Sequence, residues 1–224
     1  MSEEPSVEPG DDLHDPPGGP EVDTPERDGG GRKRPKPGER RVQILQTLAS
    51  MLEQPGSDRI TTAALAARLQ VSEAALYRHF ASKAQMFEGL IDFIESSLFT
   101  LINQILEREP DASSQARRII TVVLQFGEKN PGMTRVMVGD ALVFEHERLL
   151  ARMNQLFERI ESSLRQSLRA QAEAQASEMP TVQSNAQASV IMAFILGRLQ
   201  RYARSGFKRS PTEQLDAALQ LLTV

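Results

Sequence analysis

The residues with the types and spacing to bind a ligand lie in the segment 61–83, where hydroxyl, aromatic and basic side chains interrupt a small apolar frame. Two short helical stretches, 62–69 and 73–79, are joined by the tight turn 70–72, which is the spacing of a helix-turn-helix. Alanines allow the two helices to cross closely. The N-terminal part of the second helix then faces outward, where it can enter a major groove. We therefore expect contact with DNA from Thr61, Thr62, Ser72, Glu73, Ala74, Tyr77, Arg78, His79 and Lys83.

The polar side chains of this segment offer different contacts. Tyr77 can place its hydroxyl on a phosphate while its ring packs on the turn, and Arg78 and His79 can reach the DNA backbone. Lys83 stands in the first turn of the next helix, where the helix dipole disfavours a cation unless a phosphate is near. Each residue also has a purely structural interpretation: Glu73 as a favourable charge at a helix start, Tyr77 as core, and His79 as a surface histidine.

The net charge of -4 conceals a strong division along the chain. Residues 1–31 contain ten acidic residues and one basic residue, whereas residues 32–83 contain ten basic and four acidic residues. The basic charge is thus concentrated at the predicted DNA-contacting segment, as binding to a polyanion requires. The run 32–36 is either a basic arm that reaches phosphates or a minor groove, or a solvated charge run.

The composition excludes several classes of protein. The chain has no cysteine, and therefore no disulfide and no cysteine-bound zinc. The N-terminus is acidic and rich in proline and glycine without an apolar run, and the longest apolar stretch elsewhere, around 190–196, is too short to span a bilayer. The segment 145–147 lacks a second histidine at metal-binding spacing, and no phosphate-cradling glycine loop is present. We expect a soluble protein that is not an enzyme and has no cofactor, metal or membrane partner.

The elements that position these residues are expected to be helices throughout. Residues 1 to about 38 lack periodicity and are predicted to be disordered, whereas from residue 39 apolar side chains recur at helical spacing without a convincing strand pattern. Ser82 with Gln85 forms a capping-box pattern that predicts a helix start. The same pattern occurs at Ser210–Glu213, with a proline at the first helical position. The expected helices cover about 39–52, 62–69, 73–79, a long stretch from 82 to a break at 109–111, a stretch from there to 129, a short helix from 131, and then 143–176, 190–202 and a last helix from 211.

The string Val71-Ser72-x-x-x-Leu76-Tyr77-x-His79-Phe80-x-Ser82-Lys83 resembles the reading head of the TetR family of bacterial transcription regulators. That resemblance implies an all-α homodimer in which three N-terminal helices bind DNA. A helical C-terminal domain would provide dimerisation and often a ligand pocket. The boundaries that it implies are a tail at 1–38, a DNA-binding domain at 39–83 and a dimerisation and partner-binding domain at 84–224.

A narrower resemblance extends into the C-terminal part. The segments that carry it are 59–62, 71–80, 126–132, 154–161 and 205–212, and they are similar to the SlmA family of nucleoid-occlusion factors. The similarity covers about 40–222 and leaves the acidic tail out. It implies a dimer on palindromic chromosomal sites that binds the C-terminal tail of the tubulin-like GTPase FtsZ and antagonises division-ring assembly over the nucleoid. It also implies a cytoplasmic, nucleoid-associated location.

In that family the FtsZ tail binds between the fourth and fifth helices. The matching positions in this sequence are Phe93, Val122, Gln125, Lys129 and Asn130. Leu101 stands where the family pattern leads us to expect a basic residue, so the electrostatic part of this groove differs here. Two alternatives remain: Phe93 packs in the core, and Lys129 complements the dipole at a helix C-terminus.

The general TetR resemblance leaves a second function open, a ligand-responsive transcriptional repressor that releases DNA when a small molecule binds in its C-terminal domain. Dimerisation is expected on physical grounds as well, since two reading heads on a palindrome double a small footprint. We expect the helix at 190–202 and the helix from 211 to form the dimer interface, with Phe194 and Leu199 in it.

Overall fold

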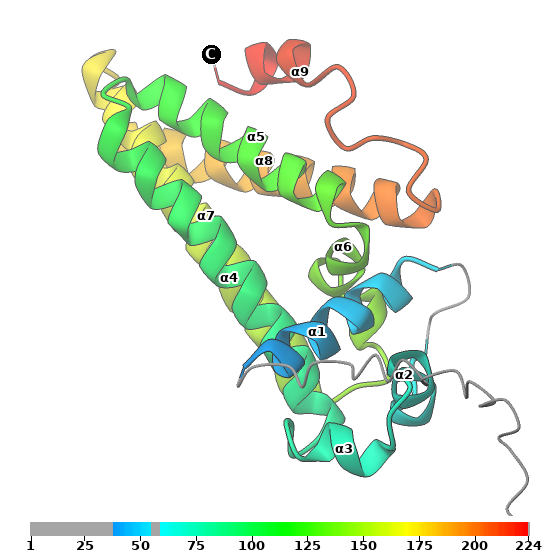
Figure 1. Cartoon of the computed structure of the whole chain (residues 1–224). Coiled ribbons are helices and arrows are strands. Elements are labelled where there is room, and N and C mark those ends of the chain that lie inside the picture. Colours follow the sequence, from blue (N-terminus) through cyan, green and yellow to red (C-terminus); the bar gives the residue numbers. More distant parts are fainter. Residues whose placement is uncertain (1–37, 55–58, 224) are drawn as a thin grey trace, which may run out of the picture. The chain divides into compact units, whose positions relative to one another are not determined.

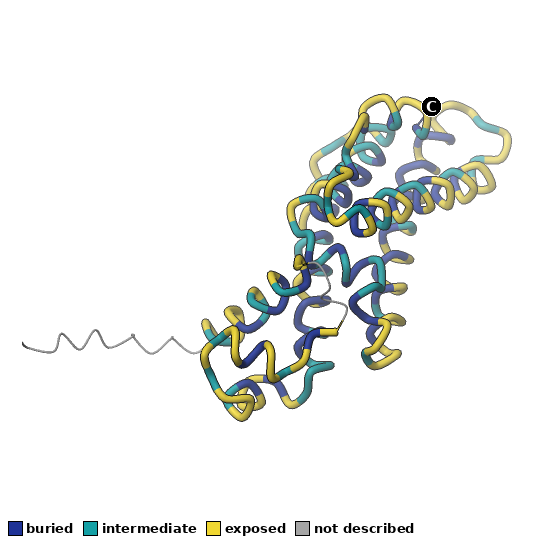
Figure 2. The backbone as a smooth tube through the Cα atoms, turned by 90° about the vertical axis from the view of Figure 1, so that its right-hand side faces the viewer, coloured by how far each residue is buried: buried dark blue, intermediate teal, exposed yellow. Residues whose placement is uncertain are grey.

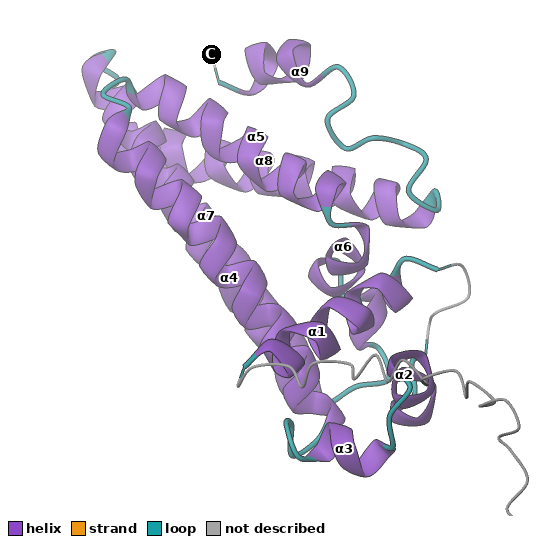
Figure 3. Cartoon of the chain, viewed as in Figure 1, coloured by secondary structure: helices purple, strands orange, loops and turns teal. Residues whose placement is uncertain are grey.

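The computed structural model describes residues 38–54 and 59–223, and every regular element within these ranges is a helix (Figures 1 and 3). This confirms the all-α class. Residues 35–224 form one compact unit. The predicted disorder of 1–38 and the basic run 32–36 fall outside the described residues, apart from Gly38. The helices are α1 (Glu39–Leu52), α2 (Thr62–Leu69), α3 (Glu73–Tyr77), α4 (Lys83–Arg108), α5 (Ala112–Lys129), α6 (Pro131–Met137), the 3₁₀ helix η1 (Asp140–Leu142), α7 (Glu147–Ala174), α8 (Pro180–Arg204) and α9 (Leu215–Leu222).

Polar side chains fix the starts of the helices around the predicted reading head. Thr61 accepts a hydrogen bond of 3.1 Å from a first-turn N–H of α2, and Ser72 accepts one of 3.3 Å at α3. At α4, Ser82 accepts from the N–H of Gln85 (3.2 Å), and the Gln85 side chain accepts in return from the N–H of Ala81 (2.8 Å). The predicted capping box is therefore formed, and the turns before α3 and α4 are set by local sequence.

The first helix joins the reading head to the rest of the unit. α1 packs against α2 and also against α6 and α4. Gly132, in the first turn of α6, lies so close to α1 that an added Cβ would sit 2.9 Å from the carbonyl carbon of Ala49 and nearer still to its oxygen. Leu65, Leu76 and Phe80 of the head are buried, and Figure 2 shows buried positions recurring along the helices. The head is thus anchored by tight helix packing.

The long helices form the C-terminal part. α4 and α7 run side by side in the same direction, and α5 and α8 return from their far ends (Figure 1). The apolar positions that the sequence places at helical spacing along α7 are all buried, which confirms the pattern of its inner face. The side chains at the centre of this core are Ile94, Leu98 and Ile102 of α4, Ile120 and Leu124 of α5, Leu156, Ile160 and Leu164 of α7, and Ile191, Ile195 and Leu199 of α8.

Arginines of α7 bind acidic and aromatic side chains of α4. Arg152 Nη2 contacts both Asp92 and Glu95, the latter at 2.6 Å. Arg159 lies with its guanidinium carbon 3.8 Å from the ring centroid of Phe99, and its Nη1 is 3.6 Å from Glu95. Pairs at the surface contribute only about 0–1 kcal/mol each. Their main effect is to fix the register of α4 against α7.

The predicted start of the long helix at 143 is wrong. Residues 140–142 form η1, and α7 begins only at Glu147. His146 is the N-cap, and its Nδ1 accepts a hydrogen bond from the N–H of Arg148 at 3.3 Å. The apolar pair Val143–Phe144, counted as helix from the sequence, lies exposed in the connecting loop.

The second capping box, predicted at Ser210–Glu213, is also wrong. The hydroxyls of Ser210 and Thr212 donate to the carboxylate of Glu128 at the end of α5, the latter at 2.7 Å. α9 begins at Leu215 instead. The Ser210 oxygen accepts from the N–H of Thr212 at 3.1 Å, two positions on, while its hydroxyl donates to Glu128, a distant acceptor that the sequence pattern alone did not reveal.

α4 is long and apolar enough to cross a membrane by length and composition alone, with a hydropathy of 1.2 in its best window. Leu90, Ile94 and Leu98 on its apolar face are buried against neighbouring helices. Packing in a protein core therefore accounts for the same composition.

Candidate nucleic-acid interface and partner groove

A polar cluster joins the two helices of the predicted reading head. Thr62 of α2 donates a hydrogen bond of 2.5 Å to the carboxylate of Glu73 in α3. The Tyr77 hydroxyl lies 3.5 Å from the same threonine oxygen, and the tyrosine side chain is exposed. Glu73 therefore has a role within the protein, since it fixes α3 against α2. Tyr77 is not core, and its hydroxyl lies at the surface that α2 and α3 share.

The remaining candidate DNA contacts form one exposed surface. Thr61, Ser72 and Ala74 lie exposed at the N-terminal ends of α2 and α3, and Arg78 and His79 lie exposed just after α3. Thr61 and Ser72 use their side-chain oxygens to cap the two helices, but their hydroxyl groups keep a proton to donate. These side chains are therefore exposed on or directly beside α2 and α3, which pack against each other.

Arg41 of α1 supports this face from behind, which sequence reasoning missed. Its Nη1 donates a 2.8 Å hydrogen bond to the carbonyl oxygen of His79, and its guanidinium carbon lies 4.0 Å from the ring centroid of Phe80. In the sequence, Arg41 is recognised only as one of the ten basic residues in 32–83. Its contact with a residue 38 positions away could not be read from the local pattern.

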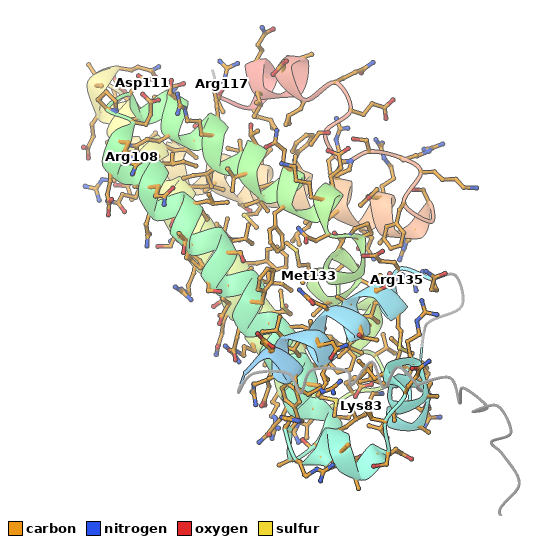
Figure 4. All side chains as sticks on the ribbon, viewed as in Figure 1. Lys83, Arg108, Asp111, Arg117, Met133 and Arg135 are labelled. Carbon is orange, nitrogen blue, oxygen red and sulfur yellow. The ribbon has the colours of Figure 1, made fainter. Side chains whose placement is uncertain are left out.

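Lys83 differs from its predicted role as a free phosphate contact. Its ammonium binds the carboxylate of Glu145 in the loop before α7, and its side chain is only partly exposed. A phosphate at this position would have to displace that carboxylate. The ion pair with Glu145 therefore explains why a lysine stands at the start of α4, where Figure 4 labels it.

Apolar side chains are exposed between α4 and α5. Phe93 is 47% exposed and Leu101 is 42% exposed, so Phe93 is not a core residue. Beside them a hollow of about 190 Å³ is lined from α4 by Leu101 and Ile105, and from α5 by Val122 and Arg118. Arg118 lies 3.0 Å from Glu109 and is largely exposed. The groove therefore has an apolar floor, and cations line it from both helices, Arg108 of α4 and Arg118 of α5.

The other candidate partner residues continue along α5. Gln125 and Lys129 are exposed on the turns that follow Val122. Asn130 donates a 2.8 Å hydrogen bond from its side chain to the carbonyl oxygen of Phe126, so that amide caps the helix end. Lys129 also lies at the C-terminus of α5, where a cation is favoured by the dipole. Its exposure leaves it available to a ligand as well.

The predicted dimer contact through Leu199 is wrong. Leu199 is 0% exposed and packs over Gly127, in the space that a side chain there would need. Phe194 is half-buried, with Arg198 stacked 4.9 Å from its ring centroid. The error arose because α8 is apolar on two faces, and the sequence does not say which one faces inward.

The other face of α8 is exposed along its length. Val190 is 59% exposed, and Val182, Ala186, Ala193 and Leu196 lie on the same side. These small and branched side chains recur at helical spacing, which is the pattern of a helix that packs against another helix.

Among residues 38–54 and 59–223, no group of three or more histidine, aspartate or glutamate side chains could hold a metal ion. Three surfaces of the molecule make up the candidate site: the α2–α3 face, the α4–α5 groove and the outer face of α8.

Comparison with known proteins gives two family matches. Residues 44–90 match the family described as bacterial regulatory proteins, tetR family. Residues 111–224 match the family described as Tetracyclin repressor-like, C-terminal domain, of the SlmA-like type.

Curated relatives cover most of the chain. The nucleoid occlusion factor SlmA of Photobacterium profundum is 54% identical over 185 residues, which is 82% of this chain and 94% of the relative. The nucleoid occlusion factor SlmA of Salmonella typhi is 54% identical over 184 residues, with 82% and 92% covered.

Solved structures share the fold. The TetR family regulator PfmR from Thermus thermophilus aligns with a TM-score of 0.67 and 21% identity over 81% of this chain and 97% of that one. The fatty acid degradation regulator FadR from Bacillus halodurans aligns with a TM-score of 0.67 and 14% identity over 84% and 97%. The architecture of this chain is therefore TetR-like.

Proposed function

Because the chain belongs to the TetR family and, within it, to the SlmA nucleoid occlusion factors, we propose that it inhibits cell division from the DNA. It is a DNA-binding regulator. In our proposal it binds palindromic chromosomal sites as a homodimer in the cytoplasm, on the nucleoid. When bound there it captures the C-terminal tail of FtsZ and antagonises assembly of the division ring. Residues 39–83 would bind DNA, and residues 84–224 would dimerise and bind the partner.

The observation that carries the partner proposal is the exposed aromatic side chain on α4. An exposed phenylalanine and an exposed leucine on the same helix add nothing to the core of the isolated chain, but they supply contacts for an apolar peptide. Phe93 and Leu101 provide that contact, and Arg118 and Lys129 lie on the α5 side. The groove therefore suits a short peptide with apolar residues and acidic neighbours.

The outer face of α8 supports dimerisation. Val190, Ala193 and their exposed neighbours form an apolar stripe on a helix that packs on its other side against α5 and α7. A two-fold axis lets this stripe pack against its own copy, because the same surface then meets itself. Two α2–α3 faces would in that way be presented to the two halves of a palindrome.

The test is sedimentation of FtsZ polymers in the presence of GTP and the full-length protein, with and without a palindromic DNA site selected from random sequence. We expect loss of polymer that depends on DNA. Phe93→Ala should weaken the effect at least tenfold, since truncating a central aromatic contact commonly costs about 2 kcal/mol. Phe144→Ala is the matched control, because Phe144 is also exposed, at 67%, but lies outside the groove.

Unchanged polymer with tight binding of the selected DNA would contradict the division-inhibitor function. The chain would then be assigned to the ligand-responsive repressors, and small molecules that lower its DNA affinity would be the next object of search. Equal loss of effect in both phenylalanine variants would contradict the position of the groove but not the function.

A further inference from the structure

The segment that follows α8 carries a cluster of cations that the proposed function does not use. Arg204, Lys208 and Arg209 are exposed, and within the described ranges no carboxylate lies within salt-bridge distance of them. Arg201, one turn earlier, has only a distant contact with Glu213, at 3.9 Å. We refer to residues 204–209 as the basic loop. Cations without a carboxylate partner are free to bind an anionic ligand, and several of them on a short span raise the local positive potential.

The backbone of the basic loop is fixed by the end of α8. Gly206 has a positive φ of 62° and donates its N–H to the carbonyl of Ala203 at 3.1 Å. Phe207 donates its N–H to the carbonyl of Tyr202 at 3.0 Å, and the two rings meet edge to face with centroids 5.2 Å apart. This pair of hydrogen bonds with its apolar contact is a Schellman motif, which ends a helix in a defined geometry.

The backbone at the tip of the basic loop is held by a side-chain oxygen. Ser205 Oγ accepts the backbone N–H of Lys208 at 3.1 Å and of Arg209 at 2.9 Å. Phe207 has a φ of 63°, a conformation that is unusual for a bulky residue, and Arg135 of α6 stacks 5.6 Å from its ring centroid. The basic loop is therefore a built structure, and the strained residue at its centre turns its neighbours outward.

The basic loop is attached to the end of the α4–α5 groove. Glu128, next to Lys129, accepts hydrogen bonds from Ser210 and Thr212, which follow the loop directly. The backbone carbonyl of Glu128 also accepts a 3.0 Å hydrogen bond from the Tyr202 hydroxyl. These hydrogen bonds tie the segment after the loop to Glu128, so the loop lies beside the end of α5 where Lys129 lies. In Figure 1 the end of α8, from which the loop follows, lies well above α3.

We propose that the basic loop binds acidic residues of the same peptide that occupies the α4–α5 groove, so that the binding site for the partner extends past Lys129 to Lys208 and Arg209. This inference rests on the proposed function. The loop adds its cations to Arg108 and Arg118, which line the groove beside Leu101. The occupant is thus an acidic stretch contiguous with an apolar tail. Arginine and lysine suit carboxylates, and little backbone freedom is lost on binding because the loop that carries them is preformed.

The experiment uses the full-length protein on its selected DNA site and fluorescence anisotropy of labelled FtsZ tail peptides. One peptide is the tail alone, and others carry four glutamates or four glutamines at one end or the other. Only the end that lies toward Lys129 can reach the loop. For that end we expect the glutamate peptide to bind about tenfold more tightly than the glutamine peptide, because two or three exposed ion pairs together give an effect of that order.

The double variant Lys208→Glu/Arg209→Glu should abolish this tenfold difference and leave the binding of the unextended tail unchanged. Arg165→Glu/Arg169→Glu on the exposed side of α7 makes the same change in net charge and should preserve the difference. The advantage of the glutamate peptide should also shrink as salt is raised.

The possible failures are distinguishable. Binding of the unextended tail with no advantage for either glutamate peptide would overturn the role of the loop and leave the proposed function standing. Absence of binding by every peptide would remove both. A loss of DNA affinity in the loop variant, with peptide binding unaffected, would assign the loop to nucleic acid and refute the proposal.

Discussion

Replacing Gly132 with alanine should separate α6 from α1 and loosen the anchor of the reading head. The added methyl carbon would lie 2.9 Å from the carbonyl carbon of Ala49, against 3.4–4 Å for an ordinary contact. The obstacle is backbone within a helix, which cannot rotate out of the way as a side chain can. The two helices would have to move apart by on the order of 1 Å, because a close-packed interior has no space to absorb the methyl group.

The cost follows from this displacement. Overpacking of a well-packed contact typically destabilises by about 1–3 kcal/mol, and a clash with backbone belongs at the upper end. The gain in helix propensity from glycine to alanine offsets at most about 1 kcal/mol. A net loss of about 2 kcal/mol corresponds to a fall in Tm of about 4–8 °C for a domain of this size.

The assay is thermal unfolding followed by circular dichroism at one fixed protein concentration, because dimerisation makes Tm depend on concentration. Gly89→Ala is the comparator: its methyl group would meet side-chain carbons alone, those of Leu45 at 3.1 Å and one of Phe80 at 3.5 Å, and the leucine can shift. We expect Gly89→Ala to change the free energy of unfolding by less than about 1 kcal/mol. A Gly132→Ala protein as stable as wild type, or more stable than Gly89→Ala, would refute the packing argument.

Three further predictions concern association, DNA binding and pH. Val190→Glu/Ala193→Glu on the outer face of α8 should yield monomers in sedimentation velocity without a change in the helical circular dichroism signal, and a persistent dimer would show that another face associates. Glu145→Gln should release Lys83 for a phosphate and steepen the salt dependence of DNA binding by about 0.9 per reading head in a plot of log affinity against log salt; an unchanged slope would mean that the lysine does not reach DNA. Hydrogen bonds from the first turn of α5 lower the pKa of Asp111 below its usual 3.8, so its stabilising effect is present above that value and is lost as pH falls through the lowered pKa. The difference in Tm between wild type and Asp111→Asn should accordingly shrink between about pH 6 and about pH 2, and a constant difference would contradict this origin.

The fold was largely predictable because its signals are local. Helical periodicity located the inner face of α7, and the capping box at Ser82 located the start of α4. The errors occurred where a distant residue competes with a local pattern. Ser210 has the sequence of a helix cap, but its hydroxyl binds Glu128, 82 positions away.

The candidate DNA face was predictable for the same reason, since its residues fall on two short neighbouring helices. The roles of single side chains were not. Lys83 was expected to be free, and it is bound by Glu145 from the loop before α7. Leu199 was expected at a surface, and it is buried because an apolar helix does not reveal which of its faces meets its own chain. Arg41 and the basic loop were missed because their meaning depends on tertiary contacts with His79 and Glu128.

The ion pairs between α4 and α7 have a mechanical consequence. Since Arg152 bridges Asp92 and Glu95 on successive turns, α4 cannot slide along α7 by one turn without losing both contacts. These contacts therefore favour a tilt of the two helices together, as a single lever with Lys83 and Arg108 at the opposite ends of α4 (Figure 4). A helix of 26 residues is about 39 Å long, so a tilt of about 5° displaces its far end by about 3 Å. A peptide wedged against the middle of α4 would move the reading head by that lever, and DNA held by the head would in turn set how well the peptide fits.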